Sequence, residues 1–252
     1  MQLKITTWNI NSVRLRIDLV AKFLKAARPD VICLQETKCP DDAFPLKRFA
    51  RLGYEHVALY GQKGYHGVVI ASRLPFESHE RADFCGKTDC RYVTATAGGD
   101  IPDPDANPKF AHKLAFLDEM RDCIRLRPGE KDRAILVGDL NVAPREHDVW
   151  SHRQMLKVVS HTPVECEKLD AAIAAGNWVD VMRAHTPEPA KLYTWWSYRA
   201  QDWAASNRGR RLDHVWTSPQ LADRVSSIAI EKGARGWERP SDHVPVTATL
   251  EV

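Results

Sequence analysis

Two carboxylates in this chain, Glu36 and Asp139, each follow a run of apolar residues, and a third, Asp213, follows Arg211-Leu212. Because a buried strand ends at a rim, side chains placed at these points are expected to converge. A fourth carboxylate, Asp242, stands beside His243, whose imidazole carries or shares a proton near neutral pH. Oxygen ligands suit magnesium, so the set predicts metal-assisted hydrolysis of a phosphoester.

The elements that must position these residues alternate along the chain. Strands are expected, from two-residue alternation or short apolar runs, at residues 3–9, 31–34, 67–72, 91–96, 134–137, 212–217, 225–231 and 244–252. Helices are expected at residues 13–27, 110–127, 149–159 and 169–175, and a long aromatic and basic loop at 194–211. The acidic motifs come from both ends and the middle of this order. We therefore expect a single domain spanning residues 1–252.

The composition is that of an ordinary water-soluble protein. The chain has 252 residues, of which 44% are hydrophobic and 27% charged, and its net charge is +3. That charge is too small to predict nucleic-acid binding without a local basic patch. No stretch is long and apolar enough to cross a bilayer and no secretory pattern opens the chain, so a cytoplasmic location is expected. A monomer is expected because no obvious apolar stripe is left over for a partner. The spacing of Cys85 and Cys90 is not that of a zinc knuckle, which favours free thiols.

Five motifs stand in order along the chain. They are Trp8-Asn9-Ile10-Asn11, Leu34-Gln35-Glu36-Thr37-Lys38, Gly138-Asp139-Leu140-Asn141, Arg211-Leu212-Asp213-His214 and Ser241-Asp242-His243. Together they resemble the exonuclease III family of AP endonucleases, in the endonuclease–exonuclease–phosphatase superfamily, over nearly the whole chain. The resemblance implies a DNase I-like α/β fold: a four-layer α/β sandwich of two mixed β-sheets packed face to face and flanked by helices. It also implies cleavage of DNA 5′ to abasic sites, 3′→5′ exonuclease action and 3′-end processing.

The same resemblance implies a role for each matching residue. Magnesium, or manganese in its place, would be held mainly by Glu36 with Asn9 and Asp242, and Asp139 and Asn141 would complete the metal site. Asp139 would also activate or position the attacking water, and Asn141 would hold the scissile phosphate. His243, oriented by Asp213, would stabilise the charge that develops on phosphorus. Its neighbour His214 is expected to face away from the site, because side chains alternate along a strand.

The expected partner is double-stranded DNA with abasic sites or 3′ ends. Residues 193–199 interleave aromatic and basic side chains, and further arginines follow, Arg211 among them. Aromatic faces stack on bases and arginines pair with phosphates. By resemblance, Trp195 would line the pocket for the base-free sugar, and Lys38, Lys63 and Arg91 would contact the DNA backbone.

The chain departs from the family near Thr96–Ala97. In the family, the strand that begins at Arg91 turns back into a second buried strand that carries a catalytic tyrosine. Here an element of about ten residues, a strand with its turn, is absent, and Thr94 stands where the tyrosine is expected. Tyr92, on the same strand face as Thr94, is a candidate replacement. Loss of one transition-state donor predicts activity lower by on the order of 10²–10³.

Other interpretations of these residues stay open at this point. Taken singly, Asp139 could shape a turn and Glu36 could cap a helix. A catalytically weakened DNA-binding member of the family is one alternative function. A phosphodiesterase or phosphatase of the same fold, acting on lipid headgroups or nucleotides, is another.

Overall fold

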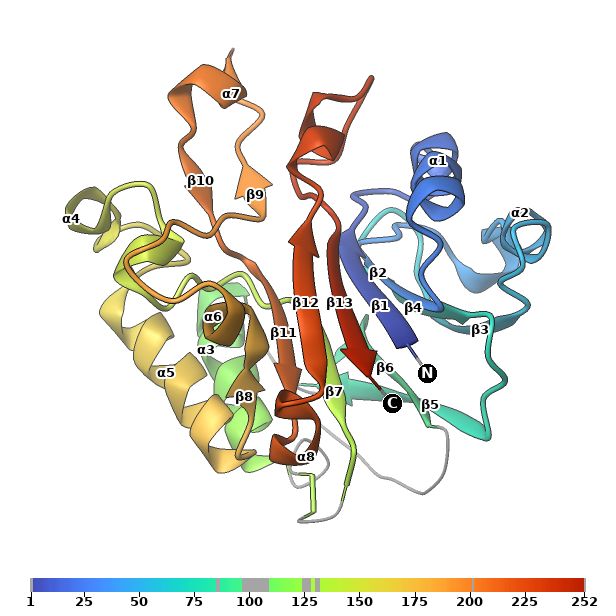
Figure 1. Ribbon diagram of the computed structural model, residues 1–252, viewed down its shortest axis with the longest axis horizontal. Helices are drawn as coiled ribbons and strands as arrows, with labels where there is room; N and C mark the ends of the chain where they lie inside the picture. The colour runs from blue at the N-terminus through green and yellow to red at the C-terminus, as the bar shows by residue number, and fades with distance from the viewer. Residues whose placement is uncertain are drawn as a thin grey trace.

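The computed structural model describes residues 2–84, 87–96, 109–123, 128–129, 132–200 and 202–251 (Figure 1). Its largest sheet has six strands in the order β12-β13-β1-β2-β4-β3. These are β12 (Val225–Ile230), β13 (Val246–Glu251), β1 (Gln2–Asn9), β2 (Val31–Gln35), β4 (Val68–Ser72) and β3 (His56–Tyr60). Strands β1 and β2 are parallel and all other neighbours are antiparallel, so the sheet is mixed.

A second layer of strands packs against this sheet. It contains a three-stranded sheet, β7 (Ile135–Asp139), β11 (Asp213–Thr217) and β8 (Val179–Asp180), in that order, and a hairpin of β5 (Ser78–Phe84) with β6 (Lys87–Thr96). Every pairing in this layer is antiparallel. Strands β7 and β11 lie on β1 and β2, whereas β6 lies on β3 and β4. The second layer is thus antiparallel rather than mixed in the described residues.

Helices cover the outer face of each layer, so the expected four-layer α/β sandwich is confirmed. Helices α1 (Ile17–Ala27) and α2 (Leu46–Ala50) lie beside the six-stranded sheet, and α3 (Lys109–Asp122) and α5 (Pro163–Ala175) lie on the opposite side of the molecule (Figure 1). Shorter helices are α4 (His152–Met155), α6 (Val181–His185), α7 (Trp203–Ser206) and α8 (Pro219–Ala222). No helix in these ranges is long and apolar enough to span a bilayer.

The alternation of side chains explains the layering. On β1, Trp8 points into the apolar cluster beneath α1, which Phe23 and Leu24 also join, whereas Ile5 faces the second layer and packs near Val137. Helix α5 begins with a capping box between Thr162 and Glu165 and with proline at its first position. The last four residues of β1 are all buried, because both faces of this strand are covered.

Most predicted strands are confirmed, but several segments differ from the sequence-based prediction. The helix predicted at 149–159 shrinks to α4, since Val158 and Val159 are exposed and Ser160 takes a left-handed conformation, φ +85°. The loop predicted at 194–211 contains β9 (Trp195–Trp196), α7 and β10 (Gly209–Arg210). Helix α1 begins at Ile17 rather than at residue 13, and β3 and β5 were not predicted.

The region of the expected missing strand is described only in part. In the described residues, β6 pairs with β5 alone and β7 pairs with β11 alone. The expected loss of a strand after β6 falls on residues outside the described ranges and stays a prediction. Residues 97–108 and the side chain of Thr94 lie outside what the structure describes.

Candidate active site

The candidate site lies at one end of the two central sheets, the upper end in Figure 1. Strands β1, β2 and β7 run toward this end, and β11 starts from it. Asn9 is the last residue of β1, and Glu36 follows the last residue of β2. Asp139 ends β7 directly opposite Asp213, the first residue of β11. Antiparallel register therefore brings together two carboxylates that are far apart in the sequence.

Asp139 is held by two amide side chains. Its Oδ2 accepts hydrogen bonds from Asn9 Nδ2 at 3.0 Å and Asn141 Nδ2 at 2.8 Å. Its Oδ1 accepts one from the backbone N–H of Asn141 at 2.9 Å. Asn141 adopts the left-handed conformation, φ +56°, which asparagine tolerates better than most residues. The Asp-Leu-Asn turn is thus closed by its own side chains.

His243 lies between two carboxylates. Its Nδ1 is 2.9 Å from Asp213 Oδ2, and its Nε2 is 3.6 Å from Asp139 Oδ2. The His243 and Asp213 side chains are buried. The Thr194 hydroxyl accepts hydrogen bonds from the backbone N–H groups of Leu212 and Asp213, which fixes the start of β11. His243 is thus hydrogen-bonded to Asp213 and lies within ion-pair distance of Asp139.

A second network surrounds Glu36 and Asp242. Lys38 Nζ lies 2.8 Å from Glu36 Oε2 and donates to Asn11 Oδ1 at 2.7 Å. Asn11 Nδ2 in turn donates to Asp242 Oδ1 at 3.2 Å, and Trp195 Nε1 donates to Asp242 Oδ2 at 3.0 Å. Glu36 and Lys38 both have positive φ, +50°, so the chain doubles back beside the metal-binding candidates. Backbone strain of this kind gathers at functional sites.

Burial and charge together set the protonation of the site. Burial raises the pKa of Asp139, against the opposing charge of His243. Burial disfavours the imidazolium of His243, but the carboxylates of Asp213 and Asp139 outweigh it and raise its pKa. Burial also opposes ionisation of Glu36 and Asp242. The ammonium of Lys38 nevertheless lowers the pKa of Glu36, and the charge of His243 with the Trp195 hydrogen bond lowers that of Asp242.

The residues around Glu36 and Asp242 fit a magnesium ion. Every candidate ligand atom is a carboxylate or amide oxygen, and the position of the Lys38 ammonium shows that Glu36 Oε2 and Asn11 Oδ1 already face a cation. In the described residues, no three His, Cys, Asp or Glu side chains form a metal site alone. Magnesium commonly uses one or two carboxylates and completes its shell with water and substrate phosphate oxygens. The donor set is consistent with that pattern.

The structure separates the predicted substrate-binding residues. Lys38 is partly exposed and belongs to the Glu36 network, whereas Lys63 is exposed. Arg91 Nη2 is 2.9 Å from His66 Nε2. Trp195 borders the site through its bond to Asp242. Tyr92 packs against the apolar cluster beneath α3 and α5.

Arg211 corrects one expectation. Its guanidinium is fully buried and binds Asp148 and Asp180, with Nε 2.9 Å from Asp148 Oδ1 and Nη1 2.7 Å from Asp180 Oδ2. It therefore holds the fold together and does not present its charge to a phosphate. His214, in contrast, faces away from the site as expected, since its Nε2 lies 2.8 Å from the backbone oxygen of Val142.

Several positioning residues were not assigned a role from the sequence. Ser241 Oγ donates to the backbone oxygen of Asn9 at 2.7 Å and so ties the last motif to the first. Lys113 Nζ donates to the backbone oxygen of Asn141 and to the buried Glu165, each at 2.5 Å. Ser241 stands next to Asp242 in the sequence, which is a usable signal. Lys113 lies in α3 and no sequence pattern points to its role, because only the fold brings it to the Asn141 turn.

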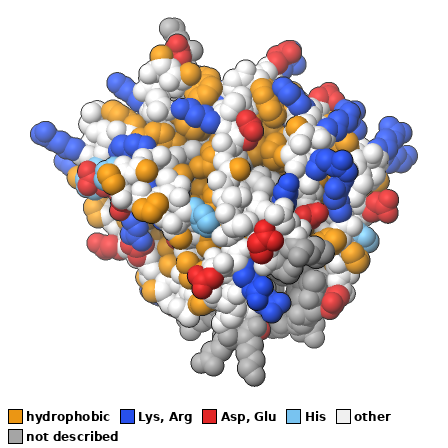
Figure 2. Space-filling view, in the orientation of Figure 1, with side chains coloured by type: hydrophobic (Ala, Val, Ile, Leu, Met, Phe, Trp, Pro, Cys, Tyr) orange, Lys and Arg blue, Asp and Glu red, His pale blue; other side chains and the backbone are white. Residues whose placement is uncertain are grey.

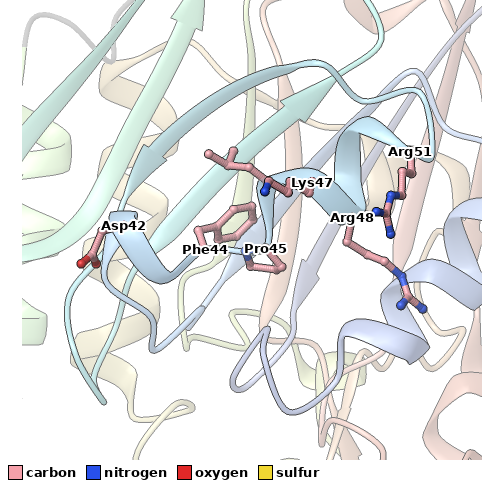
Figure 3. Close-up of a pocket in the computed structure, with 7 residues that line it drawn as sticks. Asp42, Phe44, Pro45, Lys47, Arg48 and Arg51 are labelled. Atoms are coloured by element: carbon pink, nitrogen blue, oxygen red, sulfur yellow. The ribbon is translucent and has the colours of Figure 1, made fainter.

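Another hollow lies away from this site. A cavity of about 470 Å³ on α2 is lined by Phe44, Pro45 and Leu46 together with basic side chains, as Figure 3 shows; its lining is Asp42, Phe44, Pro45, Leu46, Lys47, Arg48 and Arg51. Lys and Arg side chains are dense over this part of the face in Figure 2, around α1 and α2. One of the lining arginines, Arg48, pairs with Asp18 of α1. None of the lining residues belongs to the Asp139 site.

The fold and the site define a DNase I-like α/β protein whose strand ends gather acidic, amide and imidazole side chains. The chain belongs to the exonuclease III/AP endonuclease family: the model of the endonuclease/exonuclease/phosphatase family matches residues 6–243. Exodeoxyribonuclease III of Haemophilus influenzae is 27% identical over 99% of this chain and 100% of its own length. The family is one of DNA repair nucleases.

Solved structures agree with this assignment. An AP endonuclease from Archaeoglobus fulgidus superposes with a TM-score of 0.88 and 31% identity, covering 99% of this chain and all of that one. A 3′ phosphatase from Neisseria, bound to a product DNA hairpin, gives a TM-score of 0.84 and 29% identity at the same coverage. The second relative shows that a member of this fold binds DNA. Relatives of similar likeness thus carry different named activities.

Proposed function

We propose that this chain is a metal-dependent nuclease that hydrolyses phosphodiester bonds of double-stranded DNA at abasic sites and 3′ ends. The observation that carries the proposal is the line Asp213, His243, Asp139, in which Asp213 is hydrogen-bonded to the His243 ring and Asp139 lies 3.6 Å from its other nitrogen. Membership of a family of DNA repair nucleases supports the substrate class. Magnesium is the metal that the oxygen ligands favour, and manganese is the alternative.

In the proposed reaction, the oxygen of a water molecule bonds to phosphorus while the bond from phosphorus to the 3′ oxygen breaks. The 3′ oxygen leaves with the electron pair of that bond and takes a proton from solvent. Asp139 accepts a proton from that water, which its raised pKa favours. The imidazolium of His243 donates to a phosphate oxygen, and Asp213 keeps the ring charged and oriented. The amide of Asn141 positions the phosphate. These donors act most strongly as charge develops in the transition state.

A bound metal ion would sit among Glu36, Asp242 and Asn9, with oxygens of Asp139 and Asn141 close by, and would neutralise charge on the phosphate. Trp195 would line the pocket for the base-free sugar. Lys63 and Arg91 would contact the DNA backbone, and these contacts would weaken with added salt. All of these roles are part of the proposal.

The substitution Asp213→Asn tests the proposed line of residues. It keeps the shape of the side chain but removes the carboxylate that raises the pKa of His243. We expect kcat for nicking of an abasic duplex to fall by on the order of 10²–10³, the scale for one lost transition-state donor. DNA binding in EDTA should be unchanged. Equal kcat in the variant and the natural chain would refute the role of Asp213.

A substrate panel separates the alternatives. The same preparation is offered an abasic duplex, a mononucleotide ester and a phosphoinositide headgroup at equal concentration. Faster turnover of the abasic duplex supports the nuclease. Faster turnover of either small substrate would favour a phosphodiesterase or phosphatase, and tight DNA binding without cleavage would mark a weakened DNA-binding protein.

A further inference from the structure

Arg210 is a half-buried cation that forms no ion pair within the described part of the chain. In the described residues its Nη1 donates to the backbone oxygen of Val159 at 3.1 Å and to Ser160 Oγ at 2.8 Å, both uncharged acceptors. Its Nε is buried and has no hydrogen-bond partner. The adjacent Arg211, in contrast, binds two aspartates. A guanidinium drawn partly out of water without a counter-ion is costly, and an incoming anion would offset that cost.

The nearest carboxylate does not fill this role. Glu165 acts on Arg210 only through its charge. Its oxygens already accept from Ser160 N, from the N–H and hydroxyl of Thr162, and from Lys113 Nζ. Burial lowers the pKa of Arg210, but an arginine stays charged at neutral pH. The positive charge is therefore available to a ligand.

The position of Arg210 connects it to the candidate site. Arg210 of β10 stands opposite Trp195 of β9 in the antiparallel register, and its guanidinium carbon lies 4.8 Å from the centre of the Trp195 ring. The indole N–H of the same ring donates to Asp242 Oδ2 at 3.0 Å. One tryptophan thus contacts a metal-binding candidate through its edge and the Arg210 guanidinium through its face. Stacking on the ring fixes the guanidinium plane.

We propose that Arg210 is a specificity-determining residue that binds an anionic group of the substrate. This group is attached to the scissile phosphate on the side opposite to the 3′ oxygen. That anion is either a carboxylate on a blocked 3′ terminus or the next phosphate of a continuing strand. The inference rests on the proposed function, since it assumes that the scissile phosphate binds between Asn141 and His243. A guanidinium recognises both anions with paired N–H donors. A neutral substituent at this place would leave the cation unpaired.

Two matched 3′ ends test the carboxylate directly. One duplex carries a 3′-phosphoglycolate, and the other a 3′-phospho-(2-hydroxyethyl) group, which has the same diester but no carboxylate. Binding is measured by fluorescence anisotropy in EDTA, and kcat/KM is then measured with magnesium. We expect the natural chain to prefer the glycolate end by about 10- to 100-fold, the scale of a hydrogen bond to a charged group.

The variants assign that preference to one side chain. Arg210→Met should abolish it, and Arg210→Lys should restore part of it. Arg208→Met is the matched control, because Arg208 also stacks on a tryptophan, at 4.5 Å from the ring centre of Trp150, and should keep the preference. Thermal unfolding of each variant confirms that it is folded.

An abasic duplex separates the two sources of the anion. One outcome is that Arg210→Met weakens binding of a continuous strand more than binding of the same strand cut after the abasic sugar. If the glycolate and hydroxyethyl 3′ ends also bind equally well, the ligand of Arg210 is the next phosphate. If Arg210→Met matches Arg208→Met on every duplex, the proposal is overturned. A chain that shows the binding preference in EDTA but no cleavage with magnesium would contradict the proposed function and leave the role of Arg210 intact.

Discussion

Lowering the pH from 7 to 5 should destabilise this chain through His214. The imidazole is fully buried, and its Nε2 donates to the backbone oxygen of Val142 at 2.8 Å. Its Nδ1 is buried without a partner in the described residues. A second proton would therefore place an N–H where no acceptor lies. Burial, aided by the charge of Arg211, lowers the pKa of His214 from 6.5 to about 4.

The sign and size of the effect follow from linkage. Between pH 6.5 and pH 4 the unfolded state binds a proton at His214 and the folded state does not, so stability falls as the pH falls through this window. At pH 7 neither state is protonated to any great extent. At pH 5 the unfolded state is almost fully protonated there and the folded state only slightly. The free energy of unfolding should thus drop by about 2 kcal/mol between pH 7 and pH 5 from this one group.

The test compares urea unfolding of the natural chain and of His214→Gln at both pH values. Glutamine keeps an N–H near the position of Nε2, so the bond to Val142 is retained, and it does not titrate. Other groups that titrate in this range are common to both proteins and cancel in the difference. We expect the natural chain to lose about 2 kcal/mol more than the variant. An equal loss in the two proteins would refute the assignment of a neutral buried imidazole.

Two further predictions concern the fold around the site. Asp148→Asn removes the buried carboxylate that binds Arg211, and should lower the free energy of unfolding by about 3–5 kcal/mol. The double variant Asp148→Leu, Arg211→Met should lose less stability than Asp148→Asn alone. A larger loss in the double variant would contradict this prediction. Gly67→Ala places a methyl group 2.2 Å from Thr37 Oγ1 at φ +92°. It should destabilise more than Gly64→Ala, where φ is +77° but no atom lies within 4 Å, by about 1–3 kcal/mol in urea unfolding. Equal losses would show that the contact with Thr37 is relieved without cost.

The sequence was informative where one local pattern decides the structure. Residues 31–34 and 134–137 are apolar runs too short for helices, so they predict buried strands, and carboxylates just beyond them must emerge at a rim. The meeting of Asn9 with Asp139 then follows from the order of the strands. The pairing of His243 with Asp213 was predicted only by resemblance, because nothing local shows that β11 starts beside the last motif.

Other features depend on contacts that no local pattern encodes. Lys38 lies within the site because Glu36 and Lys38 take left-handed conformations, which neither residue type signals. Arg211 and Arg210 are identical neighbours in the sequence. Only the fold shows that Arg211 is buried between two aspartates, whereas Arg210 has no carboxylate partner among the described residues. Residues 149–159 have a helical spacing, but tertiary packing retains it only over α4.

The most direct test of the proposed function is incision of a duplex that carries one abasic site, with magnesium and then with EDTA. We predict cleavage with magnesium, none with EDTA, and a loss of at least about 10² in rate for Glu36→Gln. The exposed Glu55→Gln serves as the matched control and should cleave as the natural chain does. Cleavage that persists in EDTA, or an unimpaired Glu36→Gln, would contradict the metal-dependent mechanism.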